Sequence, residues 1–453
     1  MSESTATPRK SWGEAFAVYL EPRQLIILVM GFASGLPLLL TLSTLSYWLS
    51  KVGIDKTTIG LFALAGAPYT FKFIWSPLID QMPLPVLTRL LGWRKGWLFL
   101  LQLLLAAAIF ALGFTDPAVN AEATAMMVLA VAFFSASQDI VIDAYRIEIL
   151  KPEEQGAGAG TTQVGYRIGL LLAGAGAVAM SDFISWQAIF AILAAAVLAC
   201  AIFTLFIPEP ERRDPLVMRK IARKEFVGIA ALTNFDYRGR IKEAVVDPFA
   251  DFIRRPGWFV ILIFILFYKF GDAFGGTMAT PFYNELGFTG VEIAAVTKVW
   301  GVLATAIGGI LGGLVVARIG VFKTLMIGGV LQGITNLLFS VLAMKGHDLI
   351  WLGVAVSADN LAGGVAAAAF VAYLSELCNL AFTATQYALL TSFMAYGRTM
   401  MSSGSGWLAD HMPWPEFWAT TALMAIPGLV FLLWITRLYP NEKNLVPDQT
   451  LTP

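Results

Sequence analysis

The sequence predicts an all-α integral membrane protein with twelve transmembrane helices, arranged as two parallel six-helix bundles around a central cavity. Of its 453 residues, 57% are hydrophobic and 14% are charged, whereas a soluble domain carries about 25% charged residues. The apolar segments are long enough to cross a bilayer. In addition, charged residues inside the first group of segments recur in the same order in the second group.

Twelve apolar segments reach the length of about 20 residues that a membrane-spanning helix needs. The predicted spans are 24–50, 57–80, 96–115, 124–150, 157–181, 185–208, 258–283, 292–317, 322–344, 349–377, 384–409 and 415–437. A polar stretch divides them, which predicts an N-terminal six-helix bundle in residues 1–208, a cytoplasmic linker in 209–257 and a C-terminal six-helix bundle in 258–453. The first span is too long for the core of a signal peptide, so we expect no cleaved leader.

The distribution of basic residues predicts the orientation of these spans. If the N-terminus is cytoplasmic, the inner connections hold most of the Lys and Arg residues, including Arg94, Lys95 and the central stretch 209–257. The outer connections then hold three basic residues, which are Lys51, Lys56 and Lys345. By the positive-inside rule, we expect both termini in the cytoplasm.

The charge balance and the scarcity of histidine and cysteine exclude several classes of function. The formal net charge is zero, so the sequence offers no basic surface for nucleic acid. Cys200 and Cys378 fall in apolar spans, which excludes a disulfide framework. His347 and His411 are the only histidines and lie at span ends, which argues against a metal centre. We therefore expect no metal, no cofactor, no enzymatic activity and a monomer in the lipid bilayer.

Charged residues within the spans form an internal repeat. Each half carries three charged residues in the same order: first a lysine, which a tryptophan follows closely, then an aspartate, and then an arginine. The members are Lys72, Asp139 and Arg167 in the first half and Lys298, Asp359 and Arg398 in the second. Because six spans return the chain to its starting side, the halves are parallel copies about an axis along the membrane normal, as in the major facilitator fold.

Most of the repeated residues, together with Lys269 and Asp272, fall near the middle of their spans; Lys72 lies close by, Lys298 lies somewhat toward the outer side, and Asp143 belongs to the same layer. Charged residues inside a membrane generally face a cavity, so this layer is the predicted site of substrate or proton handling. Its cations outnumber its anions, which favours an anionic substrate. By contrast, Asp80 and the basic pair Arg94–Lys95 are expected to form structural ion pairs at the cytoplasmic mouth. The glycine pairs Gly156/Gly160 and Gly165/Gly169 are expected to let helices pack closely.

Several motifs resemble those of the AmpG family, the muropeptide permeases of Gram-negative bacteria within the major facilitator superfamily. They are GFASGLPLLLT (31–41), FKFIWSPLID (71–80), FFSASQDIVIDAY (133–145), GYRIG (165–169), YKFGDAF (268–274) and FTATQYALL (382–390). The resemblance implies proton-driven import of N-acetylglucosaminyl-1,6-anhydro-N-acetylmuramyl peptides across the inner membrane, for peptidoglycan recycling and β-lactamase induction. Distant relatives carry acetyl-CoA, so another anionic metabolite remains an alternative, as does a membrane receptor without transport.

A muropeptide carries carboxylates, amides and sugar rings, which suggests a role for each kind of side chain in the layer. The predicted substrate-binding cations are Arg167, Lys269 and Arg398, with Lys72 and Lys298 beside them and Asp359 in the same layer, because arginine binds carboxylates through two parallel hydrogen bonds. The predicted sugar contacts are Gln138, Tyr69 and Tyr145 as hydrogen-bond partners, and Trp75 and Trp300 as stacking faces.

Proton coupling is assigned to the carboxylates of the layer. Asp139 and Asp143 are four residues apart, hence on one helix face and about one turn apart. Two neighbouring carboxylates disfavour double ionisation, so one of them is expected to hold a proton. Asp143 has no counterpart in the second half, and the sequence therefore predicts Asp139 or Asp143 as the proton carrier. Asp272 is the second candidate.

Overall fold

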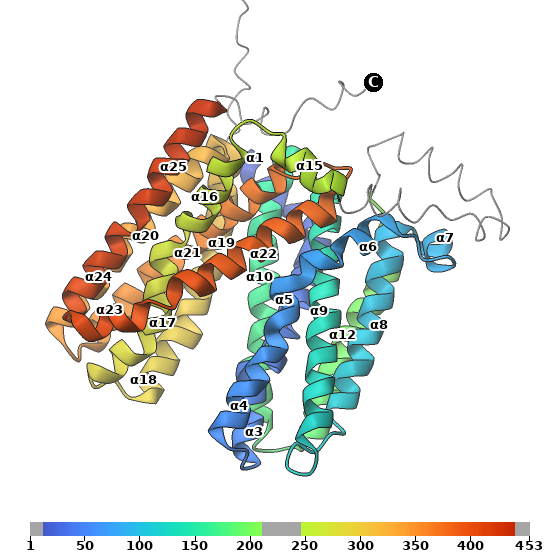
Figure 1. The fold of residues 1–453 in the computed structure, drawn as a ribbon, viewed down its shortest axis with the longest axis horizontal. Helices are drawn as coiled ribbons and strands as arrows, with labels where there is room; N and C mark the ends of the chain where they lie inside the picture. Colours follow the sequence, from blue (N-terminus) through green and yellow to red (C-terminus); the bar gives the residue numbers. More distant parts are fainter. Residues whose placement is uncertain (1–11, 211–245, 440–453) are drawn as a thin grey trace, which may run out of the picture.

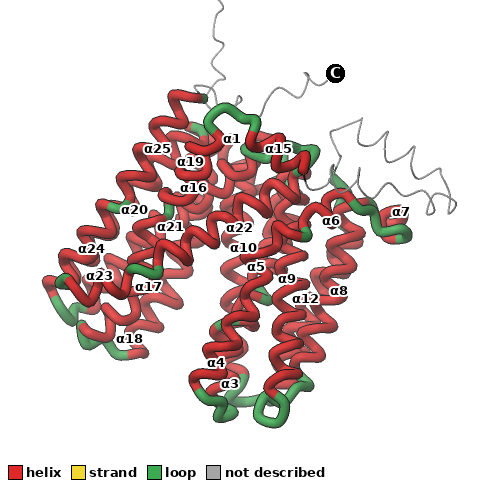
Figure 2. The backbone as a smooth tube through the Cα atoms, in the orientation of Figure 1, coloured by secondary structure: helices red, strands yellow, loops and turns green. Residues whose placement is uncertain are grey.

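The computed structural model describes residues 12–210 and 246–439, and these residues are helical with short connections (Figure 2). The first half contains α1 (Trp12–Ala17), α2 (Pro22–Gly35), α3 (Ser43–Lys51), α4 (Lys56–Phe62), α5 (Ala67–Phe71), α6 (Ser76–Gln81), α7 (Leu87–Leu91), α8 (Trp93–Leu112), α9 (Ala121–Ile149), α10 (Gln155–Leu171), α11 (Ala177–Met180) and α12 (Trp186–Phe206). The second contains α15 (Asp247–Ile253), α16 (Trp258–Tyr268), α17 (Phe270–Glu285), α18 (Gly290–Ala294), α19 (Gly301–Ile319), α20 (Val321–Lys345), α21 (Leu349–Glu376), α22 (Thr383–Ser402), α23 (Ser405–His411), α24 (Trp414–Leu423) and α25 (Ala425–Leu438).

Among the described residues, 10 helical segments are long and apolar enough to cross a membrane. The two remaining predicted spans, 57–80 and 384–409, are helical but differ in character. The first is broken into α4, α5 and α6 by the 3-10 turns η3 (Ala63–Gly66) and η4 (Lys72–Ile74), and prolines stand at the start of α5 and α6. The second is α22 followed by α23, and its many Thr and Ser residues lower its hydropathy. With these two segments, the helices account for all twelve predicted spans.

The helices form two groups that approach each other at one end of the molecule (Figure 1). Helices α2–α12 lie on the right in this view and α16–α25 on the left, and the groups diverge toward the bottom. At the top, α6, α9 and the start of α10 lie against the second group, and α1 and the end of α25 lie there too. We call the top the joined end.

A glycine seam closes part of the joined end. It consists of Gly156 and Gly160 on α10 and Gly309 and Gly313 on α19. A Cβ added to Gly160 would lie 2.5 Å from the carbonyl oxygen of Gly309, and one added to Gly313 would lie 2.5 Å from that of Gly156. The predicted close packing at Gly156 and Gly160 is therefore confirmed, and the helices that approach belong to different halves.

The second predicted glycine pair acts inside the first half. A Cβ on Gly169 would lie 2.5 Å from the carbonyl oxygen of Phe32, so Gly169 lets α10 pack against α2, and Gly165 makes a similar approach to Leu28. One face of α10 thus packs within its own half and another reaches across the joined end.

The N-terminal segment also crosses between the halves. The Tyr19 hydroxyl donates to the carbonyl oxygen of Ile310 at 2.8 Å, and the Arg318 guanidinium lies 4.1 Å from the centre of the Trp12 ring. Residues 12–20, which precede the first long helix, therefore reinforce the joined end.

Candidate functional site

The centre of α9 carries the first cluster of charges. Asp139 and Asp143 are both half-buried, and the Ser34 hydroxyl on α2 donates to Asp139 Oδ1 at 2.6 Å. The Lys72 Nζ lies 3.9 Å from Asp143 Oδ2 and also interacts electrostatically with Asp139. Lys72 stands in η4, where the broken second span brings its backbone close to α9. One lysine is thus shared by two carboxylates, one helical turn apart.

The second half contains a similar cluster built from three helices. Lys269, between α16 and α17, places its Nζ 3.2 Å from Asp272 Oδ2, and the Gln332 amide donates to the same oxygen. Asp359 on α21 accepts a hydrogen bond of 3.2 Å from the Thr335 hydroxyl and interacts electrostatically with Asp272 and Lys269. The repeat predicts Lys298 in this position, but its side chain lies outside the described residues, and the described cation is Lys269.

Arg167 on α10 and Arg398 on α22 bring two positive charges together from opposite halves. The guanidinium groups repel each other, and neither forms an ion pair with a carboxylate among the described residues. Arg398 is exposed, and Arg167 Nε has no hydrogen-bond partner in the described part of the chain. The pair is therefore available to bind an anion that lies between the halves.

Tyr166 joins this pair to the first cluster, because it interacts electrostatically with Asp139, Arg167 and Arg398. Sequence reasoning did not select it, although it stands beside Arg167 in the GYRIG motif. Ser34, Gln332 and Thr335 were also missed, since a lone hydroxyl or amide in a span gives no pattern.

The predicted sugar contacts occupy different environments. Tyr69 interacts electrostatically with Asp139, Trp75 Nε1 donates to the Ser137 hydroxyl at 2.9 Å, and Trp300 is 64% exposed. Of these three, Trp300 is exposed, Tyr69 and Trp75 are half-buried, and the Tyr69 hydroxyl itself is buried.

Gln138 and Tyr145 are fully buried, in contrast to their predicted role. The Gln138 amide donates to the carbonyl oxygen of Ala33 at 2.9 Å, and the Tyr145 hydroxyl donates to that of Pro208 at 2.7 Å. Both side chains are directed between packed helices, so in this structure they hold α9 against its neighbours and do not present a polar group to a substrate.

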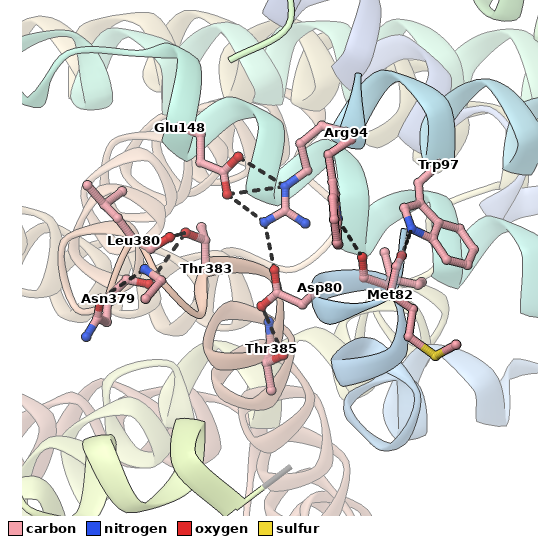
Figure 3. A network of polar contacts seen from close by, with 12 residues as sticks. Asp80, Met82, Arg94, Trp97, Glu148, Asn379, Leu380, Thr383 and Thr385 are labelled. Atoms are coloured by element: carbon pink, nitrogen blue, oxygen red, sulfur yellow. Dashed lines mark hydrogen bonds and ion pairs between the residues drawn. The ribbon is translucent and has the colours of Figure 1, made fainter. Parts of the chain in front are cut away.

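A polar latch at the joined end consists of Asp80, Arg94, Glu148 and Thr385 (Figure 3). Arg94 Nη2 lies 2.7 Å from Asp80 Oδ1 and 2.6 Å from Glu148 Oε1. Asp80 Oδ2 accepts bonds of 3.1 Å from both the backbone N–H and the hydroxyl of Thr385, at the first turn of α22 in the other half. A carboxylate is favoured at a helix N-terminus, so the latch ties the halves together.

The structural ion pair predicted for Asp80 and Arg94 is confirmed, whereas Lys95 is placed elsewhere. Its Nζ donates to the carbonyl oxygen of Leu205 at 3.1 Å. Glu209 accepts from the backbone N–H groups of Arg94 at 2.8 Å and Lys95 at 3.0 Å, and burial raises the pKa of its carboxyl group. These contacts fix the start of α8, which carries Arg94.

Two helical groups, a paired set of midspan charges and a joined end define a membrane transporter of the major facilitator type. Residues 26–304 match the family model described as Major Facilitator Superfamily. The fold is shared with the proton:xylose symporter XylE bound to 6-bromo-6-deoxy-D-glucose, at a TM-score of 0.68 and 13% identity over 93% of this chain and 95% of that one. It is also shared with the human organic anion transporter MFSD10, at a TM-score of 0.62 and 15% identity over 92% and 98%. The predicted fold class is confirmed.

Within this superfamily, the chain belongs to the AmpG family. It is 39% identical over 418 residues to the anhydromuropeptide permease of Escherichia coli K12, which covers 92% of this chain and 80% of the relative. It is 36% identical over 422 residues to a transporter named AmpG 4 from Rickettsia felis, which covers 93% and 98%. The family resemblance of the sequence motifs is therefore confirmed.

Proposed function

We propose that the protein is a proton-coupled transporter that imports anhydromuropeptides from the periplasm to the cytoplasm across the bacterial inner membrane. Its biological roles would be peptidoglycan recycling and supply of the signal for β-lactamase induction. The observation that carries the proposal is the pair Arg167 and Arg398, which contributes one guanidinium from each half and has no carboxylate partner among the described residues. The E. coli relative, named an anhydromuropeptide permease, supports the choice of substrate.

The proposed orientation places the joined end in the cytoplasm. Both α1 and the end of α25 lie there, as do the described basic residues Arg94, Lys151 and Lys323, and the positive-inside rule assigns such a face to the cytoplasm. The structure then represents the state that accepts substrate from the periplasm. In this proposal, bundles 1–208 and 258–453 move relative to each other about the linker 209–257 in a monomer.

Substrate recognition is divided among the three groups of residues described above. The arginine pair binds a peptide carboxylate by bidentate hydrogen bonds, and Lys269 provides a further cation in the second half. Tyr69 offers a hydroxyl to the sugars, and Trp75 and Trp300 offer ring faces. Lys72, Lys298 and Asp359 complete the proposed polar layer.

Proton coupling in this proposal uses the sharing of Lys72 by Asp139 and Asp143. A proton on either carboxylate leaves Lys72 paired with the other, so Lys72 keeps a counter-ion when one of them is protonated. Asp139 or Asp143 is therefore the proposed carrier. Asp272, which Lys269 and Gln332 hold in the same way in the second half, is the second candidate.

Uptake into proteoliposomes tests the proposal. The panel contains labelled anhydromuropeptides of different peptide length, the anhydrodisaccharide without peptide, and acetyl-CoA, each with and without an inward proton gradient. We expect gradient-stimulated uptake of the anhydromuropeptides. Preferential uptake of acetyl-CoA would replace the substrate assignment. Saturable binding without counterflow of labelled muropeptide would show a receptor and overturn the transport proposal.

A further inference from the structure

Arg146, in the last turn of α9, is a buried cation at the interface between the halves. Its side chain is 1% exposed, and its Nη1 donates to the Ser375 hydroxyl on α21 at 3.0 Å. The guanidinium also lies 5.4 Å from the centre of the Tyr387 ring on α22. Arg146 belongs to the first half and both contacts belong to the second, so these contacts exist only while the joined end is closed.

The positive charge of Arg146 is incompletely compensated. Its Nη2 lies 3.8 Å from Asp143 Oδ1, which is an ion pair but too long for a hydrogen bond. Nε and Nη2 have no hydrogen-bond partner among the described residues. A buried cation with unused donors depends strongly on its counter-ion. The closed arrangement of Arg146 therefore relies on the negative charge of Asp143.

Asp143 also belongs to the midspan cluster, because its other oxygen faces Lys72. The groups that act on it electrostatically come from each side: Lys72 on η4, Asp139 and Arg146 on α9, Tyr387 on α22, and Cys378 between α21 and α22. If Asp143 gains a proton, Lys72 can turn to Asp139. Arg146 has no comparable substitute, since its remaining described partners, the Ser375 hydroxyl and the Tyr387 side chain, are uncharged.

We propose that Arg146 couples the charge of Asp143 to closure of the joined end, as a positioning residue of the transport cycle. Ionised Asp143 stabilises Arg146 against the second half and keeps the joined end closed. Protonated Asp143 leaves a buried, unpaired guanidinium, which favours the state in which the joined end opens and water reaches Arg146. This inference rests on the proposed function, and its direction fits import, because a proton taken up outside would promote opening inside.

The latch provides a useful contrast. Arg94 is bound at 2.7 Å by Asp80 and at 2.6 Å by Glu148, so its charge retains a short carboxylate contact if one of them is neutralised. Arg146 has one ion pair among the described residues, and its Nη2–Oδ1 distance of 3.8 Å is long. The pH-dependent element of the joined end is therefore assigned to Arg146, and the latch supplies closure without this dependence.

The experiment measures the distance between spin labels on Lys151→Cys and Lys323→Cys, two exposed positions at the joined end of opposite halves. Pulsed electron–electron double resonance on purified protein in nanodiscs, without substrate, gives the closed and open populations as a function of pH. We expect the parent to open as pH falls. Asp143→Asn should be open at every pH. At high pH its open-to-closed ratio should exceed that of the parent about tenfold or more, because the variant destabilises one of the two states and shifts the equilibrium between them.

Two further variants separate coupling from simple packing. Arg146→Gln should abolish the pH response, and Asp143→Asn with Arg146→Gln should recover a closed population, because the guanidinium that lost its counter-ion is no longer present. Arg146→Lys keeps the charge and should retain the response if the Gln variant folds poorly. The matched control is Arg318→Gln, which removes another cation between the halves, over the Trp12 ring, and should leave the pH response intact.

The inference is overturned if, at high pH, Asp143→Asn has the distance distribution of the parent, or if Arg146→Gln responds to pH as the parent does. Because the measurement contains no substrate, its result is independent of the uptake panel. Failure of anhydromuropeptide uptake with a normal distance response would refute the proposed substrate and leave the coupling inference standing.

Discussion

Replacement of Asp80 by asparagine tests whether the latch sets the balance between the closed and open states of the joined end. Asp80 is 0% exposed, and its carboxylate binds Arg94 with one oxygen and the two donors of Thr385 with the other. Asparagine has nearly the same shape but no charge. Its single amide oxygen can accept from Arg94 or from Thr385, and its NH2 group then opposes donors on the other side.

The expected magnitude follows from the two bonds that cross between the halves. A hydrogen bond to a charged group contributes about 1.5–3 kcal/mol and a neutral one about 0.5–1.5 kcal/mol. When the Asp80 acceptor loses its charge, the two hydrogen bonds from Thr385 together lose about 2–3 kcal/mol, and only in the closed state. Since about 1.4 kcal/mol corresponds to a factor of ten, Asp80→Asn should raise the open-to-closed ratio by about thirtyfold to about 150-fold.

The assay is the same distance measurement between labels on Lys151→Cys and Lys323→Cys. Asp116→Asn is the matched control, because Asp116 is a loop carboxylate that accepts from the Ala118 N–H at 2.9 Å within one half. It should leave the ratio unchanged. If Asp80→Asn runs as a folded monodisperse protein and its ratio changes by less than about threefold, which is below 1 kcal/mol, the latch does not control closure.

Three further predictions concern the substrate, the seam and the proton. Arg398→Gln should raise the KM for anhydromuropeptide uptake about tenfold or more by loss of a charge-assisted bond, while KM for the peptide-free anhydrodisaccharide changes little; equal changes for both would contradict anion binding. Gly160→Val should shift label distances at the joined end toward the open state, because its Cβ would lie 2.5 Å from a carbonyl oxygen of the other half, whereas Gly276→Val, with nothing within 4 Å of its Cβ, should not. Asp272→Asn tests the second proton candidate: loss of gradient-driven uptake with preserved counterflow would support it, and unchanged gradient stimulation would remove it.

The fold could be predicted from the sequence because membrane insertion imposes a strong and local requirement on composition. Ten of the segments meet that requirement in length and hydropathy. The breaks within the second span were harder to foresee. Pro68 and Pro77 stand at the starts of short helices, yet proline in a span is compatible with either a kink or an interruption. The choice depends on contacts with α9 and α22 that lie far away in the sequence.

The candidate site could be predicted only in part, since helical spacing reports on one helix at a time. The four-residue spacing correctly brings Asp139 and Asp143 to one face of α9. The same geometry turns each successive residue by about 100°, so Gln138 and Tyr145 point away from that face and are buried. Contacts between helices, such as that of Ser34 with Asp139 and that of Arg146 with Ser375, have no sequence pattern that links their two members.

The internal repeat preserves the order of its charged residues more faithfully than their depth. Arg167 lies twelve residues from the start of α10 at Gln155, and Arg398 lies fifteen from the start of α22 at Thr383. Both starts are at the joined end, and a helix rises about 1.5 Å per residue, so the two arginines differ in depth by about 5 Å along their helices. The Arg167 and Arg398 guanidinium groups still interact electrostatically across the halves.

The aspartates of the repeat are more strongly staggered. Asp139 lies ten residues before the end of α9 at Ile149, and Asp359 lies seventeen before the end of α21 at Glu376, a difference of about 10 Å along the helices. The first cluster is consequently the nearer one to the joined end, and Asp143 is nearer still. Asp143 pairs with Arg146, a residue of the closed interface, whereas the described ion pair and hydrogen bonds of Asp272 and Asp359 stay within the second half. In the proposed transport cycle, the symmetry of the halves is kept at the arginine pair that binds the anion and lost at Asp143, which has no counterpart in the second half.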